Sequence, residues 1–168
     1  VIDTYLKEMK PKRILEIGTA VGYSAICFSK YLAEDGIIDT IERDEDRIAE
    51  AKTNIKEMEL DSRINIYEGD AVEILPTLNN KYDAVFIDAA KGKYTFFLEQ
   101  SLRMLDKKGI IFADNILYKG YVLSDYNKHK QRTAVRNLRE YIKQTTENEK
   151  LETEILEVGD GLAITHFH

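Results

Sequence analysis

Oxygen-bearing side chains follow two apolar segments of strand character, at the point where each segment stops. Asp88 ends the run that starts at Val85, and Asp114 and Asn115 end the run that starts at Ile110. Neighbouring parallel strands bring their carboxyl ends to one edge of a sheet, so these side chains should converge there. Two carboxylates and an amide oxygen are hard ligands, which suit Mg²⁺ in octahedral coordination. The pattern predicts a magnesium site, although a helix-capping Asp88 and an Asx turn at Asp114 are alternatives.

A glycine segment, Glu16 to Gly22, follows the first expected strand. Glycines such as Gly18 let the backbone approach a ligand closely and start the next helix tightly. The spacing lacks the full Gly-x-Gly-x-x-Gly fingerprint, so a plain strand-to-helix turn is an alternative. Glu42 favours ligand binding, because an acid that ends the second strand roughly 20 residues later commonly holds a ribose diol. Asp70 ends the third strand and could frame an adenine, so three strand ends would surround one nucleoside.

Short apolar segments alternate with longer amphipathic ones, which is typical of βαβ units and a mainly parallel sheet. The expected strands are 13–16, 37–42, 64–68, 82–88, 109–114, 151–158 and 162–167, and the expected helices are 2–9, 24–32, 46–59, 71–78, 94–105 and 133–145. Gly159-Asp160-Gly161 favours a tight turn that pairs the last two strands as an antiparallel hairpin. We therefore predict one α/β domain over residues 1–168, with a seven-stranded sheet.

Composition sets limits on the class of protein. The chain has 168 residues, of which 43% are hydrophobic and 32% charged, as in an ordinary soluble domain. The lone Cys27 excludes an internal disulfide and is expected in the core. Neither a signal peptide nor a membrane-spanning segment is recognisable, which makes the cytoplasm the expected location. His129, His166 and His168 are too scattered to favour a zinc site, which normally takes at least three protein ligands.

Three segments resemble a known family. The stretches Glu16 to Ser24 and Ile87 to Tyr94, together with the pair at 114–115, are similar to class I S-adenosylmethionine-dependent methyltransferases. Within that class they resemble the metal-dependent catechol O-methyltransferase-like family. The resemblance runs from Arg13 to the end of the chain. It implies a Rossmann-like methyltransferase fold with helices on both faces of the sheet, and often a homodimer. Because the sequence starts without Met inside an expected helix, we also expect further N-terminal helices upstream.

The resemblance also implies roles for individual residues. The cofactor S-adenosylmethionine would be contacted by Gly18, Tyr23, Ser24, Glu42, Asp70, Ala71 and Asp88, and Mg²⁺ would be held by Asp88, Asp114 and Asn115. The family has a lysine three positions after the first metal aspartate, and Lys91 occupies that position here. Lys91 and Asp88 are therefore the expected catalytic residues. Lys91 would take the proton of a substrate hydroxyl or orient that hydroxyl; the alternative is a solvated loop lysine.

Local charge bears on the acceptor. The chain carries a net charge of -6, but residues 89–94 and 118–132 are both net positive and follow the strands that supply the expected metal ligands. An RNA backbone could dock on them, and an unpaired base could stack on nearby tyrosines. The candidates for stacking are Tyr94, Tyr118, Tyr121 and Tyr126. A solvated loop with scattered tyrosines is the alternative.

The leading hypothesis is an O-methyltransferase that uses S-adenosylmethionine and Mg²⁺. Residues 88–92 look most like the bacterial branch that methylates 5-hydroxyuridine at the tRNA wobble position, which gives 5-methoxyuridine. This makes the tRNA anticodon region the preferred substrate, and a small catechol-like phenol is the close alternative. An NAD-dependent oxidoreductase would share the glycine turn and the strand-end acid but would leave the expected metal ligands without a role. A nucleoside-binding regulatory module is the non-enzymatic alternative.

Overall fold

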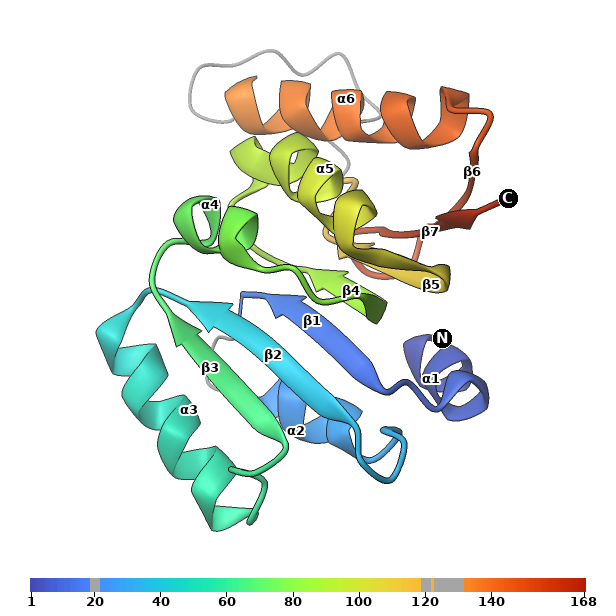
Figure 1. The fold of residues 1–168 in the computed structure, drawn as a ribbon. Coiled ribbons are helices and arrows are strands. Elements are labelled where there is room, and N and C mark those ends of the chain that lie inside the picture. The colour runs from blue at the N-terminus through green and yellow to red at the C-terminus, as the bar shows by residue number, and fades with distance from the viewer. Residues whose placement is uncertain (19–21, 119–121, 123–131) are drawn as a thin grey trace.

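The computed structural model describes residues 1–18, 22–118, 122 and 132–168. Its centre is a seven-stranded sheet in the order β3-β2-β1-β4-β5-β7-β6 (Figure 1). The strands are β1 (Arg13–Ile17), β2 (Ile37–Glu42), β3 (Ile64–Glu68), β4 (Tyr82–Ile87), β5 (Leu105–Asp114), β6 (Leu151–Leu156) and β7 (Leu162–Phe167). The first five are parallel to one another, whereas β7 runs antiparallel to both β5 and β6. The mainly parallel sheet with an antiparallel C-terminal hairpin is confirmed.

Helices cover both faces of the sheet (Figure 1). One face carries α1 (Ile2–Met9), α2 (Tyr23–Ser29) and α3 (Glu45–Glu57), and the other carries α4 (Ala71–Ile74), α5 (Tyr94–Met104) and α6 (Arg132–Glu147). Two short 3₁₀ turns, η1 (Leu75–Thr77) and η2 (Lys91–Lys93), precede β4 and α5. Each face has its own apolar core. On the α1 face, the rings of Phe28, Phe86 and Phe112 stack in series at centroid distances of 4.1 and 4.9 Å.

The strand order reverses between β1 and β4. From β1 the chain moves outward to β2 and β3, and it then returns beside β1 to form β4 and continues to β5. In open α/β sheets, ligands bind outside the carboxyl ends of the strands at such a reversal. The fold therefore directs attention to the ends of β1 and β4.

Several local features follow directly from the sequence. The carboxylate of Asp44 accepts the backbone N–H of Arg47 at 2.9 Å and caps α3, as expected for an Asp at this position. Cys27 is exposed, so its predicted place in the core is wrong. The buried residues of α2 are Ala25 and Ser29, which lie four apart on one helix face, and a residue midway between them points away. None of the described helices is both long and apolar enough to cross a bilayer.

Candidate functional site at the carboxyl ends of the strands

The central strands end at the same level. In the sheet register, Ile17 pairs with Ile87, and Ile87 pairs with Ala113. Asp88 and Asp114 each come one residue after a member of this row. The carboxylates that the sequence singled out therefore leave adjacent strands side by side, at the edge where the strand order reverses.

Gly18 is required by the close approach of β1 and β4. Its N–H donates to the carbonyl of Ile41 at 3.1 Å, and its φ of 101° lies in the region that favours glycine. A Cβ at this position would overlap the backbone carbonyl of Asp88. Gly18 thus brings the start of the glycine segment directly against Asp88. Residues 19–21 of that segment lie outside the described residues.

A buried carboxyl lies beneath the glycine turn. Glu16 on β1 is only 3% exposed, and its carboxylate accepts hydrogen bonds from the hydroxyls of Ser24 and Thr40, the latter at 2.8 Å. Burial raises the pKa of Glu16 to about 7 against the lowering effect of these two hydrogen bonds, and the charges of Asp88 and Glu42 raise it further. Glu16 belongs to the glycine segment, but the sequence pattern predicts no role for it. The signal in the sequence was an acidic residue near the end of a buried strand, two residues before a glycine.

The raised pKa of Glu16 predicts a pH dependence of stability. Because its ordinary pKa is 4.5, the folded protein keeps a proton between pH 4.5 and about 7 that the unfolded chain has lost. The free energy of unfolding should therefore fall as pH rises through this window, by up to about 3 kcal/mol from this group. Urea unfolding at about pH 5 and about pH 8 measures the fall, and Glu16→Gln should remove most of it. Glu68→Gln, at an exposed carboxylate, should keep the fall; equal falls in wild type and Glu16→Gln would contradict the assignment.

Glu42 is held in place at the end of β2. One of its carboxylate oxygens, Oε2, accepts the backbone N–H groups of Arg43 at 2.9 Å and Asp44 at 3.1 Å. The residue is 9% exposed. It pairs in register with Glu68 on β3, whose carboxylate is half exposed and bound to Lys52 at 2.7 Å. Of these two neighbouring acids, Glu42 is the one fixed next to the strand reversal.

The remaining residues of the expected cofactor set lie at the same edge. Asp70 caps α4 by accepting the N–H of Val72 at 2.9 Å, and Ala71 is the first residue of that helix. Tyr23 begins α2 and is 63% exposed. Ser24 follows it, and its hydroxyl is engaged by Glu16. Helix capping, the alternative role considered for Asp88, is thus the role that Asp70 has at α4.

Asp88, Asp114 and Asn115 lie close together. The carboxamide nitrogen of Asn115 donates to Asp88 Oδ1 at 3.1 Å, and the backbone N–H of Asn115 donates to Asp114 Oδ1 at 2.9 Å. Asn115 has a φ of 57°, which asparagine tolerates better than most residues. Burial raises the pKa of Asp114, and the charge of Asp88 raises it further; the hydrogen bond from Asn115 and the charge of Lys91 lower it. Like charges thus face one another at this point, as in a site that takes a cation.

Lys91 lies beside this acidic group. Its charge acts on Asp114, and its Nζ is 5.5 Å from the centroid of the Tyr118 ring, within cation–π range. Tyr94, expected as a stacking platform for a base, is fully buried, so that prediction is wrong. Tyr121 and Tyr126 lie outside the described residues.

Helix α6 supports the turn that carries Lys91. The carboxamide of Asn137 on α6 accepts the N–H of Thr95 at 2.9 Å and donates to the Thr95 hydroxyl at 3.0 Å. Thr95 lies in the first turn of α5, which has no side-chain cap of its own, so Asn137 satisfies a backbone donor that would otherwise lack a partner. The 3₁₀ turn η2 packs against α6 immediately before this point. The position of Lys91 is therefore set by tertiary packing.

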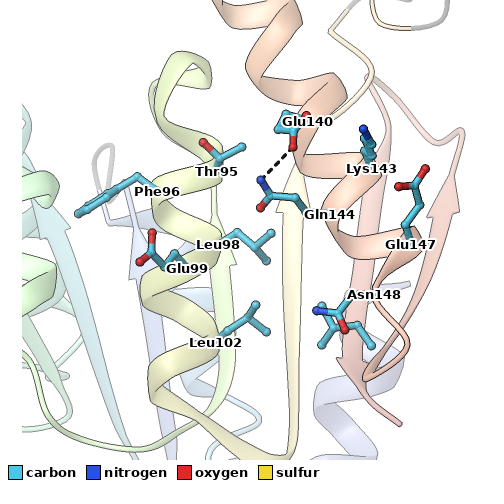
Figure 2. Close-up of a pocket in the computed structure, with 11 residues that line it drawn as sticks. Thr95, Phe96, Leu98, Glu99, Leu102, Glu140, Lys143, Gln144, Glu147 and Asn148 are labelled. Atoms are coloured by element: carbon cyan, nitrogen blue, oxygen red, sulfur yellow. Dashed lines mark hydrogen bonds between the residues drawn. The ribbon is translucent and has the colours of Figure 1, made fainter.

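A separate groove runs between α5 and α6 (Figure 2). Its volume is about 670 Å³. Leu98 and Leu102 of α5 line it, and Glu140 and Gln144 of α6, joined by a 3.1 Å hydrogen bond, lie across from them. None of the strand-end residues described above lines this groove. It is therefore distinct from the candidate site.

Comparison with known proteins supplies the family. The family model described as O-methyltransferase matches residues 2–166. A catechol O-methyltransferase from Niastella koreensis is 35% identical over 162 residues, which cover 91% of this chain and 72% of that protein. The chain belongs to the O-methyltransferase family. A caffeoyl-CoA O-methyltransferase from Populus kitakamiensis is 30% identical to this O-methyltransferase over 171 residues. The matched region covers 97% of this chain and 73% of that protein.

A solved structure supports the same family. The SAH-bound methyltransferase PaMTH1 from Podospora anserina superposes with a TM-score of 0.88 at 27% identity, covering 98% of this chain and 75% of that one. The chain is thus an enzyme of the O-methyltransferase family with a Rossmann-like methyltransferase fold. Family membership displaces the oxidoreductase and regulatory-module alternatives.

The strand-end residues of this O-methyltransferase fit a hard divalent cation. The ligand atoms available from Asp88, Asp114 and Asn115 are all oxygens, once the carboxamide of Asn115, whose nitrogen donates to Asp88, turns its oxygen toward the cation. The carboxylates of Asp88 and Asp114 repel each other, and a bound cation would relieve this repulsion. Within the described residues, no group of three His, Cys, Asp or Glu side chains offers an alternative metal site.

Proposed function

We propose that this chain transfers a methyl group from S-adenosylmethionine to the hydroxyl of a small catechol-type phenol, with Mg²⁺ bound at the ends of β4 and β5. The observation that carries the proposal is the hydrogen bond from Asn115 to the carboxylate of Asp88, whose own backbone lies directly against Gly18. A cation site and a nucleoside site then share Asp88. The related catechol and caffeoyl-CoA O-methyltransferases support the phenolic acceptor.

The cofactor would bind across the ends of β1, β2 and β3. Glu42 presents a fixed carboxylate to the ribose hydroxyls, and Asp70 and Ala71 flank the adenine at the start of α4. Gly18 admits the backbone close to the ligand, and Tyr23 and Ser24 border the methionine part at the start of α2. The charges of Glu42 and Asp88 both act on Glu16, so this end of the sheet favours a cationic ligand such as a sulfonium.

Asp88, Asp114 and Asn115 would hold Mg²⁺ through their side-chain oxygens. When bound, Mg²⁺ acts as a Lewis acid that favours the deprotonated form of a phenol, and S-adenosylmethionine supplies a methyl group on a positively charged sulfur. Lys91 lies close enough to act on Asp114, so its Nζ would orient the hydroxyl toward the donor or, as the neutral amine, receive the hydroxyl proton. Holding both partners in line is expected to supply much of the rate enhancement.

Glu42→Ala should chiefly weaken cofactor binding. Loss of charge-assisted hydrogen bonds to the ribose should cost about 1.5–3 kcal/mol, which corresponds to roughly 10- to 150-fold in affinity. Calorimetry with S-adenosylhomocysteine measures this directly. Glu68→Ala is the matched control, since Glu68 pairs with Glu42 in register on the neighbouring strand and has no assigned ligand. Wild-type affinity in Glu42→Ala would remove Glu42 from the cofactor site.

A second acceptor is 5-hydroxyuridine at the wobble position of tRNA, which would give 5-methoxyuridine. Lys91 and Lys93 in the same turn, with Tyr118 beside Lys91, favour a nucleic-acid partner. Most of the second positive segment lies outside the described residues, and the buried Tyr94 cannot serve as a stacking surface. The phenolic acceptor is therefore placed first. A single domain over residues 1–168 and a cytoplasmic location, both expected from the sequence, and a homodimer, expected from the family resemblance, complete the proposal.

One assay distinguishes the two acceptors. The protein is incubated with methyl-labelled S-adenosylmethionine and either a panel of catechols or tRNA that contains 5-hydroxyuridine, and the products are identified by mass analysis. We expect a labelled methyl ether from a catechol. Label in 5-methoxyuridine alone would select the RNA acceptor, and no transfer to either would overturn the proposed substrates.

A further inference from the structure

The hydroxyl of Tyr94 joins the ends of β4 and β5. Tyr94 is fully buried, and its hydroxyl donates to the backbone carbonyl of Asp114 at 2.9 Å, with the carbonyl of Ile87 at 3.3 Å as a second acceptor. The backbone of Ala89 also hydrogen-bonds this hydroxyl. Because carbonyl oxygens only accept hydrogen bonds, the hydroxyl is the donor in both contacts.

This link extends the sheet beyond its own hydrogen bonds. The last register pair of β4 and β5 is Ile87 with Ala113, so the two aspartates emerge where the regular pairing ends. The Tyr94 hydroxyl contacts the backbone on both sides of that point, at Ile87 and at Asp114. A single buried side chain thus ties together the two segments that carry the proposed cation ligands.

We propose that Tyr94 is a positioning residue that fixes the separation of Asp88 from Asp114 and Asn115, and so sets the affinity of the site for a divalent cation. This role rests on the proposed function, because it presupposes that these side chains bind the cation. Hydrogen-bonding partners that orient metal ligands commonly contribute 10- to 100-fold to metal affinity. Tyr94 would act through the backbone and not as a ligand.

The chain offers two matched tyrosines for comparison. Tyr141 is fully buried with its ring 5.9 Å from that of Tyr94, and its hydroxyl has no hydrogen-bond partner within the described part of the chain. Tyr82 is also fully buried, and its hydroxyl donates to Asp39 at 2.7 Å. Tyr82 begins β4, at the end of that strand remote from Asp88. A comparison of variants that lack each hydroxyl therefore separates loss of the link between β4 and β5 made by Tyr94 from loss of any other buried hydroxyl or hydrogen bond.

The test compares Tyr94→Phe, Tyr82→Phe and Tyr141→Phe. Calorimetric titration with Mn²⁺ alone, without cofactor or acceptor, gives cation affinity, and urea unfolding gives stability. We expect Tyr94→Phe to weaken Mn²⁺ binding about tenfold or more, with Mn²⁺ affinity unchanged in Tyr82→Phe and Tyr141→Phe. The side-chain amide resonance of Asn115 in the cation-free protein should move only in Tyr94→Phe.

The outcomes separate this inference from the proposed function. A wild-type chain that binds no Mn²⁺ would overturn the proposed cation site and the role of Tyr94 with it. A wild-type chain that binds Mn²⁺, with equal affinity in Tyr94→Phe, would overturn only the role of Tyr94. An equal loss of affinity in Tyr82→Phe, or a Tyr94→Phe variant that does not fold, would show that the hydroxyl acts through general stability and would also overturn it.

Discussion

Asp114→Ala should reduce cation-dependent methyl transfer by about 10³-fold or more while cofactor affinity stays within about threefold of wild type. The proposed cation would stabilise the negative charge that develops in the transition state by several kcal/mol, and Asp114 would supply one of its carboxylate ligands. The proposed cofactor residues follow β1, β2, β3 and β4 and lie outside the segment that carries Asp114, so they should be unaffected. Steady-state kinetics at several Mg²⁺ concentrations, with calorimetry using S-adenosylhomocysteine, measures both quantities.

Asp160→Asn is the control for this change. Asp160 is exposed and its charge also acts on Asp114, but it has no assigned ligand role. It should retain near-wild-type activity, which would separate ligand loss from loss of negative charge. The variant Asp114→Ala should also fold, because burial and Asp88 already disfavour the charged form of this carboxyl and raise its pKa. Full activity in Asp114→Ala would rule out the assigned cation site.

Lys91→Met should slow the chemical step by about 10² to 10⁴-fold, the range expected for loss of a positioned proton acceptor. Methionine retains much of the length and the packing of the lysine stem but cannot accept or donate the proton. Single-turnover rates with enzyme in excess isolate this step from product release. Cofactor affinity should change little, because Lys91 interacts with Asp114 and Tyr118, which are outside the proposed cofactor residues.

Lys93→Met is the matched control for Lys91→Met. Both lysines belong to the turn η2, but Lys93 is exposed and has no role in the proposed chemistry. A catechol acceptor predicts a large effect at Lys91 and a small one at Lys93. Equal single-turnover rates for wild type and Lys91→Met would reject the role of Lys91 as base or orienting group.

The strand-end chemistry was accessible from sequence because it depends on local rules. Apolar runs that stop at Asp88 and Asp114 predicted neighbouring parallel strands, and the register row through Ile87 places both carboxylates at one level. Glu42 followed from the same reasoning at the end of β2, two strands from β4. These predictions required only the alternation of elements and the shared edge of a parallel sheet.

Burial by distant elements was harder to foresee. Tyr94 looks like a surface aromatic in a positive segment, but β4, β5 and α6 enclose it. Cys27 looks apolar and central, yet the short helix α2 buries Ala25 and Ser29 instead. Glu16 received no role because its contacts with Ser24 and Thr40 join residues from three elements. In each case, the deciding contacts come from parts of the chain that local patterns do not bring together.

The proposed cation site is tested most directly by methyl transfer from S-adenosylmethionine to a catechol by the wild-type protein, measured after chelation and again after Mg²⁺ is restored. We expect chelation to abolish transfer and added Mg²⁺ to restore it in wild type but not in Asp114→Ala. Undiminished transfer in the presence of chelator would contradict a cation site formed by Asp88, Asp114 and Asn115.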